Sequence, residues 1–79
     1  MNRLTATELD DLSLARRLSS DGVARDLREK AQLPQSEIAR TLGVGRALVC
    51  NWEHGRRVPT GLVGARYGAL LRQWQRGSL

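Results

Sequence analysis

The residues best suited to binding chemistry lie in one short segment near the middle of the chain, from Arg46 to His54. Read as a helix, with about 100° between successive residues, this segment separates into two sides of different character. The apolar side consists of Leu48, Val49 and Trp52. The other side contains no acid and consists of Arg46, Ala47, Cys50, Asn51 and His54. Such a helix can pack on a domain through its apolar side and present hydrogen-bonding groups on the other.

The polar side has the chemistry that the edges of DNA bases require. An arginine can donate two hydrogen bonds to guanine O6 and N7, and an asparagine can pair with adenine N6 and N7. We therefore expect Arg46 and Asn51 to read bases, while Ala47 and Cys50 are small enough for close approach and for contact with a thymine methyl group. Each residue taken alone is equally well explained as solvent-exposed surface, and only their grouping beside a tight turn favours a major-groove reader.

Groups that suit DNA phosphates flank this segment. Gln35 and Ser36 come at the expected start of a helix, where unpaired backbone N–H groups and the helix dipole favour an anion. His54, Arg56 and Arg57 follow the expected recognition helix, and we expect them to contact phosphates as well. The alternative for the two arginines is a basic loop that is merely solvated.

The pattern of apolar residues and helix breakers predicts an all-α fold, a compact bundle of about five helices. The expected helices span about 6–19, 23–32, 35–42, 45 or 46 to 54, and 60–75. Thr7 is the expected cap of the first, and Gly43 is expected to end the third in a left-handed conformation. A turn this short forces the third and fourth helices to cross steeply, as in a helix-turn-helix unit. We assign residues 1–20 to an N-terminal helical extension and 21–79 to a helix-turn-helix DNA-binding domain.

Charge and composition narrow the function classes. The 79-residue chain has 13 Lys and Arg against 8 Asp and Glu, for a net charge of +5, and Glu53 is the only acid after Glu37. A basic C-terminal half of this kind fits a polyanion partner. The single cysteine and single histidine leave no disulfide and no metal site, and we expect no cofactor and no enzyme activity. No signal peptide or membrane span is apparent, so we expect a cytoplasmic, nucleoid-associated protein.

A family resemblance covers residues 23–74. The residues that carry it are Gln35-Ser36-Glu37-Ile38-Ala39, Leu42-Gly43-Val44, Val49, Trp52-Glu53, Gly55 and Pro59. They resemble the Xre/Cro-type, or lambda-repressor-like, helix-turn-helix family. The resemblance implies a fold of four or five helices and a prokaryotic or phage transcription regulator, which usually binds its operator as a two-fold dimer.

The resemblance also implies roles for individual residues. Gln35 and His54 match phosphate-contacting positions, and Arg46, Ala47 and Asn51 match base-reading positions. Arg28 and Glu53 match a charge pair that ties two helices together. The sequence departs from the family at Pro34 and Gly45, where serine or threonine usually caps a helix.

The expected function is sequence-specific binding of double-stranded operator DNA by a Cro- or repressor-like regulator, with no small-molecule ligand and with a homodimer formed in solution or only on DNA. The alternative is a protein-interaction module on the same fold, such as an antitoxin-type partner. An RNA-binding role is disfavoured because Trp52, Tyr67 and Trp74 are expected in the core. Gly61, Gly64, Ala65 and Gly68 form a small-residue stripe that would allow close helix packing, either within the domain or between two copies. The first helix is expected to cover the core, with dimerisation and partner binding as alternatives.

Overall fold

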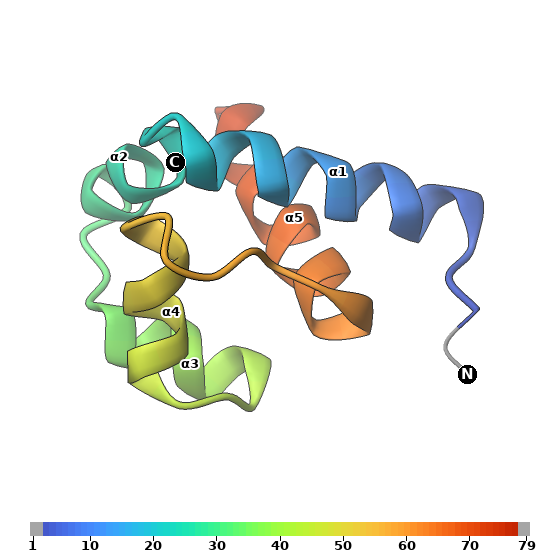
Figure 1. Ribbon diagram of the computed structural model, residues 1–79. Helices are drawn as coiled ribbons and strands as arrows, with labels where there is room; N and C mark the ends of the chain where they lie inside the picture. Colours follow the sequence, from blue (N-terminus) through green and yellow to red (C-terminus); the bar gives the residue numbers. More distant parts are fainter. Residues whose placement is uncertain (1–2, 78–79) are drawn as a thin grey trace.

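Five α-helices and no strand make up the part of the chain that the computed structural model describes, residues 3–77 (Figure 1). The helices are α1 (Ala6–Ser20), α2 (Val23–Lys30), α3 (Gln35–Leu42), α4 (Arg46–Glu53) and α5 (Gly61–Gln75). The expected all-α class is confirmed, and a Cα radius of gyration of 11.4 Å shows that the bundle is compact. Among the described residues, no helix is both long enough and apolar enough to cross a membrane.

The two long helices, α1 and α5, form the most extensive helix pair and lie across one another in Figure 1. Two glycines of α5 allow this close approach. A Cβ atom on Gly68 would collide with the backbone carbonyl of Asp11, and one on Gly64 would lie 2.6 Å from Cδ1 of Leu12. These two glycines of the small-residue stripe therefore serve packing within the chain, and α1 covers the core as expected.

The core is assembled from all five helices. Its buried members are Leu14, Ala15, Leu18, Ala24, Ile38, Ala39, Leu42, Val49, Trp52, Tyr67, Leu71 and Trp74. The rings of Trp52 and Tyr67 stack with centroids 4.7 Å apart, which joins α4 to α5. The three aromatic residues expected in the core are all there.

Two local expectations were wrong. Thr5, and not Thr7, caps α1. Its hydroxyl accepts a hydrogen bond from the Glu8 backbone N–H, and the Glu8 carboxylate accepts one from the Thr5 backbone N–H. This capping box satisfies two backbone donors that the helix itself leaves unpaired. Leu9 of the same helix is 55% exposed, because α1 turns the side that carries Leu14 and Leu18 toward the core.

The second is the end of α2, which stops at Lys30 and not at Gln32. Gln32 adopts a left-handed conformation with φ of 60°, and the Leu33 N–H returns to bond the carbonyl of Arg28 at 3.3 Å. Pro34 disfavours the helical conformation at Leu33, and the left-handed Gln32 closes the helix before that residue.

The connection between α3 and α4 has only three residues, 43–45. Gly43 ends α3 with φ of 73°, as expected, and the Val44 N–H bonds the carbonyl of Ala39 at 2.9 Å. Val44 packs against the core, which holds the turn in place. Gly45 precedes α4 in an extended conformation without a side-chain cap, as does Pro34 before α3.

Candidate nucleic-acid interface

The structure divides α4 into the two sides that its sequence indicates. Val49 and Trp52 are buried, and Leu48 is half-buried against the core. On the other side Arg46, Ala47 and His54 are exposed, and Cys50 and Asn51 are partly exposed. The expected base-reading residues thus share one accessible surface.

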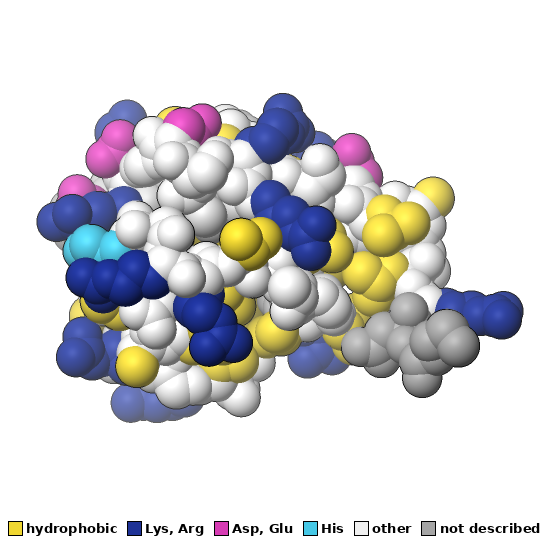
Figure 2. All heavy atoms as spheres, in the orientation of Figure 1, with side chains coloured by type: hydrophobic (Ala, Val, Ile, Leu, Met, Phe, Trp, Pro, Cys, Tyr) yellow, Lys and Arg dark blue, Asp and Glu magenta, His cyan; other side chains and the backbone are white. Residues whose placement is uncertain are grey.

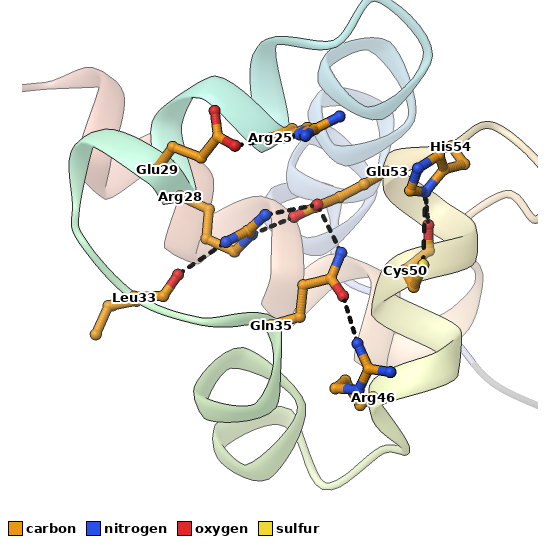
Figure 3. Close-up of polar contacts among 9 residues, drawn as sticks. All are labelled: Arg25, Arg28, Glu29, Leu33, Gln35, Arg46, Cys50, Glu53 and His54. Atoms are coloured by element: carbon orange, nitrogen blue, oxygen red, sulfur yellow. Dashed lines mark hydrogen bonds and ion pairs between the residues drawn. The ribbon is translucent and has the colours of Figure 1, made fainter.

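Glu53, the last residue of α4, is turned away from that surface. Its side chain has no exposed area, and both of its oxygens bind the guanidinium of Arg28: Nε to Oε2 at 2.6 Å and Nη2 to Oε1 at 3.0 Å (Figure 3). Arg28 also donates to the carbonyl of Leu33 at 2.9 Å, so it ties α2 to both its own C-terminal loop and α4. The ion pair that the resemblance implies is present in the structure.

This arrangement keeps Glu53 charged inside the protein. Burial raises the pKa of its carboxyl group, but hydrogen bonds from Arg28 and Gln35 outweigh burial and leave the pKa below its ordinary value. The bond to Glu53 likewise raises the pKa of Arg28. The only carboxylate of α4 therefore lies inside the domain, already neutralised, and adds no exposed negative charge to the accessible side of the helix.

Gln35 continues this network to the surface. Its Nε2 donates to Glu53 Oε1 at 2.9 Å, and its Oε1 accepts from Nη1 of Arg46 at 3.1 Å (Figure 3). The amide orientation follows from its partners, because a carboxylate can only accept and a guanidinium can only donate. Gln35 and Arg46 were expected to have separate roles, as phosphate contact and base reader. The structure brings them together, while Ser36 stays exposed beside them.

His54 is held by the last turn of α4. Its Nδ1 lies 2.8 Å from the carbonyl oxygen of Cys50 and 3.5 Å from the Cys50 sulfur. The carbonyl can only accept, so Nδ1 carries the proton in this geometry.

The arginines that have a side-chain partner among residues 3–77 fall into two groups. Arg25, Arg28, Arg40 and Arg72 bind carboxylates. Arg46, Arg56 and Arg16, which lie on α4, in the loop after it and on α1 beside that loop, bind neutral oxygens instead. Their contacts are Arg46 to Gln35 Oε1 at 3.1 Å, Arg56 to Asn51 Oδ1 at 3.5 Å, and Arg16 to the carbonyl of Pro59 at 2.9 Å.

Arg57 makes no side-chain hydrogen bond or ion pair within residues 3–77. In Figure 2 the acidic side chains lie along the upper part of the view, among some dark blue Lys and Arg side chains, and the Lys, Arg, Asp and Glu side chains that the face below them shows are dark blue only. Within the described residues, no carboxylate therefore offsets the charge of Arg57.

One residue at this surface, Arg16, was not predicted from the sequence. Arg16 lies 43 positions from its partner Pro59, and it was considered only as part of the first helix. The missing signal is the crossing of α1 over the loop before α5, which no local pattern encodes.

Comparison with known proteins found no protein-family model, no curated protein sequence and no solved structure that matches the chain. Among residues 3–77 no group of three or more His, Cys, Asp or Glu is placed to hold a metal ion. The candidate function is therefore argued from the geometry of this surface.

Proposed function

We propose that this chain is a sequence-specific DNA-binding transcription regulator of the Cro or repressor type. In this proposal α3, the turn 43–45 and α4 act as a helix-turn-helix, and α4 lies in the major groove. The observation that carries the proposal is the sorting of charge on α4. Glu53 is buried and paired, while Arg46 and Asn51 lie on the accessible side and bind only neutral groups or Arg56.

The side chains on the accessible surface divide into base readers and phosphate contacts. Base readers are Arg46, Ala47, Cys50 and Asn51. Phosphate contacts are Gln35, Ser36, His54, Arg56 and Arg57. Phosphate contacts position a protein on the duplex and carry no sequence information, so preference for a sequence comes from the first group.

Two features support base reading by α4 in particular. Its opposite side is buried in the core, with Val49 and Trp52 fully packed, so the helix is held rigidly. The guanidinium of Arg46 is held by Gln35 before DNA binds. Part of the ordering cost of that long side chain is therefore met in the free protein, which favours affinity.

A single α4 covers only a few base pairs. We propose that two copies bind related half-sites, with their recognition helices in successive major grooves about 34 Å, or one turn, apart. Such a protein would act in the nucleoid by occupying an operator, and it needs no cofactor.

Selection of bound duplexes from a random pool, at about 150 mM salt, tests the proposal. We expect enrichment of an inverted repeat with half-site centres about ten base pairs apart. In a second round Arg46→Ala should lose preference at one position per half-site, worth about 1–3 kcal/mol. Arg66→Ala, which removes the same charge from an exposed site on α5, should keep the wild-type preference.

Absence of any enriched sequence would overturn the proposal and would favour a protein partner. Enrichment that Arg46→Ala leaves intact at every position would retain DNA binding but remove Arg46 as a reader.

A further inference from the structure

A small cleft lies between α1 and the loop that joins α4 to α5. Its volume is about 70 Å³, well above the roughly 10–15 Å³ that one water molecule needs. The lining residues of the cleft that matter here are Arg16, Ser20, Trp52, Arg57 and Pro59. No acid lines it, so two guanidinium groups border a space without a carboxylate to balance them.

The position of Arg16 is set by the loop. Its Nε donates to the carbonyl of Pro59 at 2.9 Å, and Pro59 is itself buried. This bond leaves the two terminal nitrogens of the guanidinium without a partner among residues 3–77. Arg16 and Arg57 are both exposed. Two like charges at one cleft repel each other, and an anion between them would remove that repulsion.

We propose that Arg16 and Arg57 together bind one phosphate of the DNA backbone. The guanidinium fork matches phosphate oxygens, and the fixed Nε of Arg16 aims its remaining donors without further ordering. This inference rests on the proposed function and extends it. Helix α1, which lies outside the helix-turn-helix region, becomes part of the DNA footprint, and the loop 55–59 connects its Arg16 to α4.

The two arginines of this site neutralise a single phosphate, which predicts a specific coupling. Loss of one phosphate contact lowers the slope of log affinity against log salt by about 0.9. Arg16→Gln and Arg57→Gln should each lower it by up to that amount and weaken binding about 3- to 10-fold at physiological salt. The double variant should be little weaker than either single variant, because the phosphate is held only when both arginines contact it, so the first loss already breaks the site.

The experiment measures the affinity of the selected duplex over a range of salt for wild type, both single variants and the double variant. Arg66→Gln is the matched control, since it removes one exposed arginine that does not line the cleft. Duplexes with one neutral methylphosphonate linkage at each position in turn then locate the contact. We expect one linkage whose neutralisation weakens wild type but leaves Arg16→Gln unaffected.

If Arg16 acted only structurally, through its bond to Pro59, the salt slope would not depend on its charge. Arg16→Lys keeps the charge but not the guanidinium geometry, so it should recover most of the salt slope if the phosphate contact is real. A slope equal to wild type in Arg16→Gln, or equal weakening at every linkage, would overturn the inference while leaving sequence-specific binding intact. Failure of wild type to bind any duplex would overturn both the inference and the proposed function.

Discussion

Gln35 Oε1 and Arg46 Nη1 lie 3.1 Å apart, so a hydrogen bond joins the first residue of α3 to the first residue of α4. The same amide donates to the buried carboxylate of Glu53 at 2.9 Å. The direction of the proposed base reader is thus coupled, through one neutral side chain, to the ion pair that holds α2 and α4 together.

Gln35→Ala should free the Arg46 side chain and remove one hydrogen bond from Glu53. We expect a smaller preference at the base pair that Arg46 reads, together with a loss of about 1–3 kcal/mol in unfolding free energy, because a bond to a charged group is lost. The ratio of affinities for the selected duplex and for one altered at that base pair measures the first effect, and urea unfolding measures the second. If Gln35→Ala and Arg46→Ala reduced preference additively in the double variant, the two residues would act independently.

The buried ion pair between Arg28 and Glu53 should dominate the polar contribution to stability. Glu53→Gln or Arg28→Met leaves one buried charge without its partner, and such changes typically cost about 3–5 kcal/mol. Glu29→Gln is the matched control, because its pair with Arg25 is about half exposed and should contribute less than about 1 kcal/mol. Urea unfolding of the three variants provides the comparison, and equal stability of Glu53→Gln and Glu29→Gln would refute this account.

The lowered pKa of Glu53 makes its contribution depend on pH in a defined direction. A carboxyl group with a folded pKa below its unfolded value, about 4.3, stabilises the fold above that value. This stability is lost as the pH falls through the folded pKa. The difference in unfolding free energy between wild type and Glu53→Gln should therefore be constant near neutral pH and shrink below about pH 4.3. A difference that grew on acidification would mean that the pKa is raised.

Two glycines with opposite surroundings should respond oppositely to substitution. Gly68→Ala places a Cβ against the Asp11 backbone, which cannot move without separating α1 from α5, so we expect a loss of at least about 1–3 kcal/mol. Gly45→Ser adds a capping hydroxyl where a Cβ meets open space and φ is −76°, and it should stabilise by about 0.5–1 kcal/mol. Thermal unfolding tests both, and a neutral Gly68→Ala would show that the two helices are not held at this distance.

Tyr67 is the only tyrosine, so its titration can be followed without interference. Burial, together with repulsion from Glu53, raises its pKa to about 12. Phenolate absorbance should show a midpoint near 12 in the folded protein and near 10 in urea. Because the folded pKa is the higher one, this group stabilises the fold below about pH 10, and the contribution disappears as the pH rises toward 12. A native midpoint near 10 would place the ring in contact with solvent.

Much of the helical framework can be predicted from local patterns in the sequence. The bounds of α3 and α4, the left-handed Gly43 and the two sides of α4 all follow from periodicity and helix breakers, which act within about four residues. The buried role of Glu53 was also predictable, since it is the only acid in a basic half. Errors arose where two local signals competed, as with Thr5 and Thr7 at the start of α1.

Contacts between distant residues depended on how the helices cross. The Gln35–Arg46 bond, the close approach of Gly68 to Asp11 and the placement of Arg16 beside Pro59 span 11, 57 and 43 positions. Residue type and helical period fix which side chains share a face of one helix, because that relation is set by backbone geometry alone. Which face meets which is decided by the packing of the whole core, so only the tertiary structure reveals these partners.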